Sequence, residues 1–403
     1  MRISQRASAM QESPIRKLAP LASAAKSRGV QIYHLNIGQP DLPTPKAFLQ
    51  AIAQWRQPVL AYGPSDGLPA LREAVCQYFS RYGIALEPNQ VLVTNGGSEA
   101  ILFAFNVVAD EGDEIIVPEP FYTNYNGYAQ MANLRLVPVR THAEDGFHLP
   151  PDEVLERAVS PKTKALLLCS PNNPTGTVLT REELERAAGF CLRHDLFLIA
   201  DEVYKEFTYD GRTHTSVLEL PEVAQRVIVV DSISKRFSAC GARVGAIISR
   251  NREVMAACLK LGQARLCPPT LEQIGAAAAY QLGEEYFAAV REEYQKRRDV
   301  LFTKLTAAEG IVLRKPRGAF YMIVKMAGVS DADEFAAWLL RDFAWEGETV
   351  MVAPASGFYA TPGAGRDEVR IAYVLEAPKL ERAAEVFLEG LARYRALQPT
   401  LAR

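Results

Sequence analysis

The sequence lacks an excess of charge of either sign. It has 45 lysines and arginines against 47 aspartates and glutamates, a net charge of −2. This balance gives no electrostatic reason to expect nucleic acid or an anionic membrane as a partner. The longest apolar runs are only as long as strands, so we expect no membrane-spanning helix. Residues 1–8 contain no apolar stretch typical of a secretory signal, and we therefore predict a globular cytoplasmic protein.

Cysteines are few and show no pairing pattern. None of the six stands at a spacing typical of zinc or haem attachment, so we predict no metal site. Scattered cysteines in apolar surroundings are typical of reduced core thiols. The sequence also lacks a Walker loop and the Gly-x-Gly-x-x-Gly fingerprint, which argues against a nucleotide enzyme and a nicotinamide oxidoreductase. No internal repeat is apparent.

The composition supports a large core. A chain of 403 residues with 48% hydrophobic residues can bury a sizeable core and form more than one domain. Between about residues 91 and 250, apolar strand-like runs alternate with helical stretches and glycine turns, which predicts a sheet layered between helices. The strands are expected from residue 91 and at 114–117, 164–169, 196–200 and 226–231, and helices are expected up to residue 108 and at 181–194.

Other elements are expected at both ends of the chain. Residues 15–28 show helical spacing, and residues 31–37 have the pattern of a strand. A helix at 284–309 should connect the large sheet to a smaller domain. Further strands are expected at 318–324, 349–352 and 368–373, with helices near 332–343 and 378–395.

The segment 232–245 carries the densest set of reactive side chains. It follows an apolar strand, and the carboxyl ends of strands hold the active sites of open α/β sheets. Its serines, Lys235 and Arg243 suit an anionic ligand that is also attacked by an amine. A solvated loop could carry the same residue types, so the segment alone leaves function open.

A strand, a glycine turn and a helix start follow one another at residues 91–100. This order directs unpaired backbone N–H groups and the positive end of a helix dipole at one point, where a phosphate can bind. A purely structural turn would look alike. Beside Lys235 the phosphate interpretation is favoured, with Gly96, Gly97 and Ser98 as donors.

Two charged residues stand in apolar strands. Asp201 closes the strand at 196–200, and burying a carboxylate without a partner costs several kcal/mol, so Asp201 needs a cation. Arg370 stands mid-strand between apolar neighbours, which is unusual for an unpaired guanidinium. Strand arginines are more often exposed or ion-paired, and this alternative stays open for Arg370 on its own.

Together these segments resemble a known family. The pattern Ser-x-Ser-Lys at 232–235, followed by Gly-x-Arg-x-Gly at 241–245, resembles the cofactor-attachment segment of the class I/II aminotransferases. These are the fold type I enzymes, similar to aspartate aminotransferase, that use pyridoxal 5'-phosphate (PLP). Eight segments between residues 32 and 373 agree with the family in order. The resemblance implies an α/β fold with a mostly parallel central sheet between helices and a smaller α+β domain made from both termini.

The resemblance also implies roles for individual residues. Lys235 would be the Schiff-base lysine and proton shuttle, Asp201 would pair with the ring nitrogen, and Tyr204 would reach the phenolic oxygen. Tyr122 would stack on the ring, although the neighbouring Phe121 leaves that choice open. The phosphate would be held by Gly96, Gly97, Ser98, Ser232, Ser234, Arg243 and, from the other subunit of a homodimer, Tyr62.

The substrate side of the site follows from the same resemblance. Asn173, in the turn Asn-Pro-Thr-Gly, would donate to the phenolic oxygen beside the substrate, and Gly38 and Arg370 would bind the α-carboxylate. Gln39 stands where the family often has glutamate, so that local contact is open. The expected activity is transfer of an amino group between an L-amino acid and a 2-oxo acid, with aspartate and 2-oxoglutarate as the first choice.

Two alternatives and a domain division complete the expectations. A carbon–sulfur lyase uses the same fold and cofactor. A PLP-binding regulator would need a helix-turn-helix domain, for which the roughly thirty residues before Ile32 leave no room. The predicted division is an N-terminal segment at 1–40 that joins the small domain, a large PLP-binding domain at 41–285 and a small C-terminal domain at 286–403.

Overall fold

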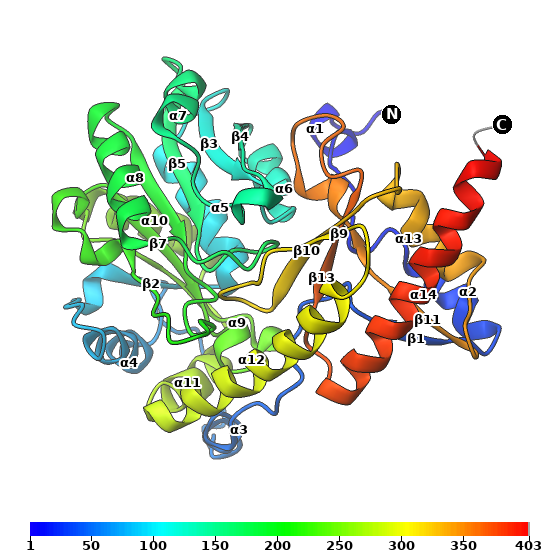
Figure 1. The fold of residues 1–403 in the computed structure, drawn as a ribbon. Helices are drawn as coiled ribbons and strands as arrows, with labels where there is room; N and C mark the ends of the chain where they lie inside the picture. The colour runs from blue at the N-terminus through cyan, green and yellow to red at the C-terminus, as the bar shows by residue number, and fades with distance from the viewer. Residues whose placement is uncertain (402–403) are drawn as a thin grey trace.

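The computed structural model describes residues 1–401, with side chains through residue 397. Figure 1 shows a large sheet covered by helices on one side of the molecule and a smaller group of strands and helices on the other. The N-terminus and the last helix, α14 (Ala377–Leu401), both lie on the side of the smaller group. None of the helices within residues 1–401 combines the length and apolar character needed to cross a bilayer.

A seven-stranded sheet forms the centre of the larger part. Its strand order is β2-β8-β7-β6-β5-β3-β4, and neighbours from β4 to β7 are parallel. Only β8 runs antiparallel to both of its neighbours, so the prediction of a mostly parallel sheet is confirmed. The strands are β2 (Val91–Thr94), β3 (Glu114–Glu119), β4 (Arg135–Arg140), β5 (Thr163–Cys169), β6 (Phe197–Asp201), β7 (Val227–Ser232) and β8 (Gly245–Ile248).

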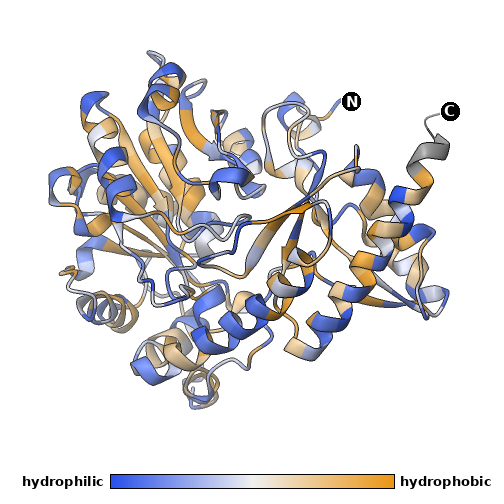
Figure 2. Cartoon of the chain, viewed as in Figure 1, coloured by the Kyte–Doolittle hydropathy of each residue, from blue (hydrophilic) through white to orange (hydrophobic). Residues whose placement is uncertain are grey.

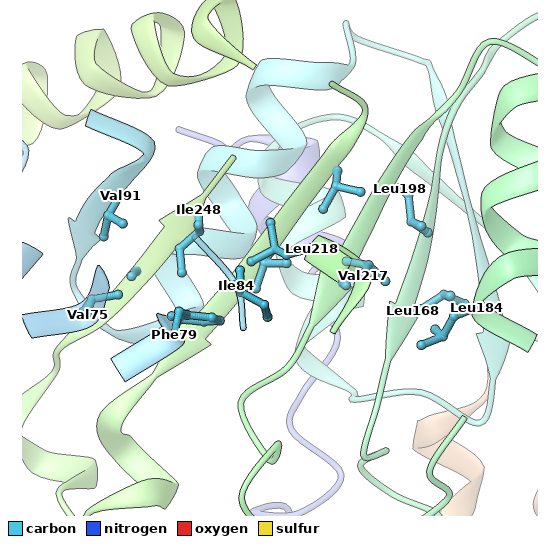
Figure 3. Packing of buried hydrophobic residues seen from close by; sticks show 14 of the residues in the cluster. Val75, Phe79, Ile84, Val91, Leu168, Leu184, Leu198, Val217, Leu218 and Ile248 are labelled. Atoms are coloured by element: carbon cyan, nitrogen blue, oxygen red, sulfur yellow. The ribbon is translucent and has the colours of Figure 1, made fainter. Parts of the chain in front are cut away.

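Helices cover both faces of this sheet, which explains why its strands are apolar without interruption. Successive side chains of a strand point to opposite faces, and both faces are buried here. Leu166 and Leu168 of β5 pack in the core beside α4 (Pro69–Ser80) and α8 (Arg181–Arg193). Leu167 packs in the separate core beside α5 (Gly96–Val108) and α10 (Arg252–Arg265). Figure 2 shows the apolar strands between helices with polar outer faces, and Figure 3 shows part of the first core.

The smaller part combines both ends of the chain. Strand β1 (Gln31–His34) pairs in parallel with β11 (Glu348–Met351), so the N-terminal segment joins residues from the C-terminal region. A second sheet has the order β12-β13-β10-β9, formed by Ala353–Pro354, Glu368–Ala372, Tyr321–Met326 and Ile311–Val312. The α+β arrangement is as predicted, whereas the boundaries at residues 40 and 285 stay a prediction. The helices around it are α2 (Ala19–Ser27), α12 (Glu284–Thr306), α13 (Ala332–Arg341) and α14 (Ala377–Leu401).

Several elements differ from the sequence expectation. The first long helix begins at Ala19 rather than at residue 15, because Pro20 occupies its first turn and residues 14–18 form turns. Strands β4 and β8 had not been predicted. The remaining helices are α1 (Gln5–Ser8), α3 (Lys46–Ala53), α6 (Asn124–Met131), α7 (Asp152–Ala158), α9 (Ile233–Arg236) and α11 (Thr270–Ala279).

Candidate active site

A cavity of about 360 Å³ lies where β5, β6 and β7 end, and the small part closes it with Tyr321 of β10 and Arg370 of β13. This edge of the sheet is where ligands bind in open α/β folds. Gly96 and Tyr62 are the two predicted site residues that do not line it. The cavity brings together the others: Gly38, Gly97, Ser98, Tyr122, Asn173, Asp201, Tyr204, Ser232, Ser234, Lys235, Arg243 and Arg370.

Lys235 enters the cavity from the short helix α9, which directly follows β7. The hydroxyl of Ser232 accepts a hydrogen bond from the backbone N–H of Ser234 and so caps this helix. The amine of Lys235 donates to the carbonyl oxygen of Gly38 at 2.9 Å and contacts the sulfur of Cys240 at 3.7 Å. The amine therefore points into the cavity and has no carboxylate partner among the described residues.

Asp201 lies at the floor of the cavity and is 7% exposed. The hydroxyl of Tyr125 donates to its carboxylate at 2.6 Å, and the backbone N–H of Val203 donates at 3.3 Å. Burial raises the pKa of Asp201 from its ordinary value of 3.8 to about 6, although the hydrogen bond from Tyr125 opposes this rise. No side chain of residues 1–397 forms an ion pair with Asp201, so the site supplies a buried carboxylate without its cation.

A cradle for an anion lies at the start of α5. The first N–H groups of a helix have no partner within the helix, and those of Gly97 and Ser98 border the cavity. Arg243, with φ of 54°, lies so close to Gly96 that a Cβ there would be 2.3 Å from the guanidinium. The hydroxyls of Ser232 and Ser234 are 2.8 Å apart on the same wall. Hydroxyls, a guanidinium and helix N–H groups together fit a phosphate monoester.

The aromatic residues divide between the cavity and the core. Tyr122 lines the cavity and contacts Tyr125 edge to face, with ring centroids 5.5 Å apart. Phe121 is 1% exposed and packs in the core, so the geometry favours Tyr122 as the ring that faces a ligand. The hydroxyls of Tyr204 and Tyr321 are 2.9 Å apart, and burial raises the pKa of Tyr204 well above its usual value.

Arg370 is buried in the wall of the cavity. It is 1% exposed and donates to the side-chain oxygen of Asn173 at 3.1 Å and to the carbonyl oxygen of Asn36. Burial lowers the pKa of this guanidinium, and its Nε has no hydrogen-bond partner. Both hydrogen-bond partners are neutral, so no carboxylate of the described residues balances the positive charge of Arg370. Such a guanidinium can bind a carboxylate through two parallel hydrogen bonds.

Sequence reasoning missed four residues of the site. Tyr125 holds Asp201, Tyr321 holds Tyr204, and Arg16 and Cys240 line the cavity. Tyr125 follows Tyr122 at the helical spacing of three, which was a usable signal. Cys240 lies in the segment 232–245 that the sequence had singled out, five residues after Lys235, so its position was a usable signal as well. Arg16 and Tyr321 gave none, because they come from segments that are remote in sequence from the rest of the site.

The match to known proteins covers almost the whole chain. The family profile described as "Aminotransferase class I and II" matches residues 30–387. The chain belongs to this family. Aspartate aminotransferase from Geobacillus stearothermophilus is 33% identical over 395 residues, which cover 96% of this chain and 98% of that protein. Aromatic-amino-acid aminotransferase 2 from Thermococcus litoralis is 34% identical over 392 residues, covering 96% and 97%.

The solved structures agree with the aminotransferase family. Alanine aminotransferase from Pyrococcus furiosus superposes with a TM-score of 0.89 at 30% identity, covering 97% of this chain and 100% of that chain. The predicted family and fold type are therefore confirmed, and the chain is a PLP-dependent transaminase. Neither the lyase nor the regulator is favoured by these relatives. The family implies PLP as the cofactor, and the roles of single residues stay proposals.

Proposed function

We propose that this transaminase moves the amino group of an L-amino acid to a 2-oxo acid in the cavity between the seven-stranded sheet and the smaller part, with Lys235 as the residue that binds PLP covalently. One observation carries the proposal. An amine, a buried carboxylate without a cation and a buried guanidinium without a carboxylate face the same cavity. Each of these three groups lacks the partner that a PLP-bound amino acid would supply.

The donor set of the cavity fits PLP. Asp201 would hold the protonated ring nitrogen, and this cation would remove the cost of burying the carboxylate. The cradle of Gly96, Gly97, Ser98, Ser232, Ser234 and Arg243 would hold the phosphate. Tyr122 would cover one face of the ring, and Tyr204 and Asn173 would donate to its phenolic oxygen. When bound, PLP supplies an electron-withdrawing ring that stabilises negative charge on the substrate Cα.

The chain itself moves the proton and orients the substrate. A lysine amine acts as a base only in its neutral form, and a free lysine is almost fully protonated near neutral pH. Lys235 would take the proton from Cα and return it to the cofactor side. Arg370, together with the backbone N–H of Gly38, would fix the α-carboxylate. A Cβ on Gly38 would lie 1.8 Å from the hydroxyl of Tyr321, so a larger residue there would displace this ring.

The charges of the cavity favour a substrate with two carboxylates, such as aspartate with 2-oxoglutarate. Four cations line it: Arg16, Lys235, Arg243 and Arg370. The last three have the roles given above. The guanidinium of Arg16 forms no hydrogen bond or ion pair with the described side chains, and Ser13 and Gln39 also line the cavity. Arg16 is the cation left to bind a side-chain carboxylate.

We expect Arg16→Gln to lower kcat/KM for aspartate and glutamate by about 10- to 100-fold, the worth of a charge-assisted hydrogen bond. Alanine, which has no second carboxylate, should change by less than about threefold. Steady-state kinetics with 2-oxoglutarate or pyruvate as acceptor measure both effects. Arg6→Gln, which removes a positive charge from the exposed start of the chain, is the matched control. Equal losses for all three substrates would contradict the role of Arg16.

The proposed reaction is tested by a screen of amino acids. Half-reactions followed by the absorbance of bound PLP, with release of the matching 2-oxo acid, should be fastest with dicarboxylic amino acids. Release of pyruvate and a thiol from cystathionine, with no transfer of an amino group, would instead indicate a carbon–sulfur lyase. Absence of both activities in PLP-loaded protein would refute the proposed function.

We also propose a cytoplasmic homodimer in which Tyr62 reaches the phosphate of the partner site. The side chain of Tyr62 is 82% exposed and lies outside the cavity of its own chain, with exposed Val59 and Leu60 beside it. An apolar group of this kind is typical of an interface. We expect sedimentation to give a dimer, and Tyr62→Phe to weaken PLP retention by about tenfold, as one charge-assisted hydrogen bond would. A monomer that retains PLP fully would contradict both parts.

A further inference from the structure

The amine of Lys235 has two neighbours that accept its hydrogen bonds, and they differ in kind. The carbonyl oxygen of Gly38, at 2.9 Å, belongs to the backbone and cannot be changed by substitution. The sulfur of Cys240, at 3.7 Å, is the only side-chain partner of this amine among the described residues. These two acceptors are the hydrogen-bond partners of the amine among the described residues.

Cys240 is itself held in place on both sides. It begins the short 3₁₀ turn Cys240–Ala242 that connects Lys235 with Arg243. Its thiol donates to the carbonyl oxygen of Ser234 at 3.1 Å, and its own carbonyl oxygen accepts from the guanidinium of Arg243 at 2.9 Å. One half-buried residue on the cavity wall thus contacts both the amine and the cation of the phosphate cradle.

We infer that Cys240 is a positioning residue that holds the amine of Lys235 between its proton transfers, an inference that rests on the function proposed above. A hydrogen bond to the charged form of an amine favours that form, and the effect grows with the strength of the acceptor. Thiol sulfur is a weak acceptor, whereas a hydroxyl oxygen is a strong one. The thiol therefore orients the amine through a weak hydrogen bond at 3.7 Å. The residue type at this position sets the balance between orientation and basicity.

Substitutions of different acceptor strength test this balance in the cofactor-free chain. The rate at which PLP attaches to the chain requires a neutral amine, so its pH midpoint reports the proton affinity of that amine. Cys240→Ser should raise the midpoint by about 0.5 to 1 pH unit, the worth of a stronger hydrogen bond, and Cys240→Ala should lower it. Equal midpoints in wild type and both variants would overturn the inference.

Steady-state kinetics of Cys240 variants distinguish a positioning role from a purely structural one. We expect Cys240→Ala to lower kcat by about tenfold with little change in KM, because a displaced amine transfers protons less efficiently. Cys240→Ser keeps an acceptor and should restore kcat at pH values above its raised midpoint. If serine is as slow as alanine at every pH, or if KM alone changes, Cys240 does not act through Lys235.

Chemical modification gives a readout that needs no turnover. Iodoacetamide converts the thiol to a thioether with loss of iodide and a proton, and the added group would occupy the space that the amine needs. Peptide mass spectrometry should show that the fraction labelled at Cys240 equals the fraction of chains unable to attach PLP. Label at Cys76 and Cys267, both partly exposed and outside the cavity, should have no effect. Chains labelled at Cys240 that attach PLP normally would contradict the inference, whereas a wild-type chain that attaches no PLP would instead contradict the proposed function.

Discussion

Lys235→Ala should abolish transamination, with a fall in kcat of at least about 10⁴-fold. The substitution removes both the nucleophile and the group that moves the Cα proton, and the proton transfer alone contributes a factor of about 10² to 10⁴. The amine contacts no more than Gly38 and Cys240, so its removal should leave the fold intact. Single-turnover kinetics with PLP-loaded protein, together with circular dichroism, measure the loss and the integrity of the fold.

A second buried lysine provides the control for this prediction. Lys205 is 5% exposed, and burial lowers its pKa to about 8, so its amine is also a plausible nucleophile. It lies outside the candidate active site, against the rings of Tyr78, Phe79 and Tyr82 at 3.9 to 4.6 Å. Lys205→Met should keep covalent PLP and most of the turnover. Loss of covalent PLP in Lys205→Met but not in Lys235→Ala would reverse the assignment.

Asp201→Asn should change activity and stability in opposite directions. In the PLP-loaded enzyme the ring nitrogen loses its buried partner, and breaking a buried ion pair costs about 3 to 5 kcal/mol. We therefore expect kcat to fall by about 10² to 10⁴-fold. Single-turnover rates with aspartate measure this loss. A variant with nearly full activity would show that Asp201 does not pair with the ring.

The cofactor-free chain should instead become more stable. Burial raises the pKa of Asp201 from 3.8 to about 6, so the folded state binds its proton more tightly than the unfolded chain does. The contribution of Asp201 to the free energy of unfolding is fully present below about pH 4 and is lost as the pH rises to about 6. Above that pH, the free energy of unfolding of Asp201→Asn should be up to about 3 kcal/mol larger than that of wild type. The two free energies should become equal near pH 4. Urea unfolding of both cofactor-free proteins across this range measures the difference, and a constant difference would contradict it.

The sequence predicted the residues that stand at strand ends or in glycine turns. Asp201 closes an apolar strand, and Lys235 follows another, so the rule for open sheets places both at one edge of the sheet. The order of the apolar runs likewise predicted the layered sheet. Sequence alone did not predict β8 or its antiparallel direction, because its four residues, Gly245–Ile248, are too few to show a strand pattern.

The partners of the predicted residues could not be derived from the sequence. Tyr125 and Asp201 are 76 residues apart in sequence, and Tyr321 and Tyr204 are 117 residues apart. Local residue patterns carry no information about contacts between residues so far apart in sequence. Arg16 enters the cavity from the turn before α2, where the sequence had predicted a helix. Gly96 and Tyr62, by contrast, were predicted as site residues but do not line the cavity. Gly96 lies behind Arg243, and the proposed role of Tyr62 requires a second chain.

The covalent site of PLP is the most direct test of the whole account. Borohydride reduction of the PLP-loaded protein fixes the cofactor to its lysine, and peptide mass spectrometry then locates it. We predict one pyridoxyl group per chain, on the peptide that contains Lys235. A pyridoxyl group on Lys205 or on an exposed lysine, or its absence from protein that transaminates, would contradict the assignment.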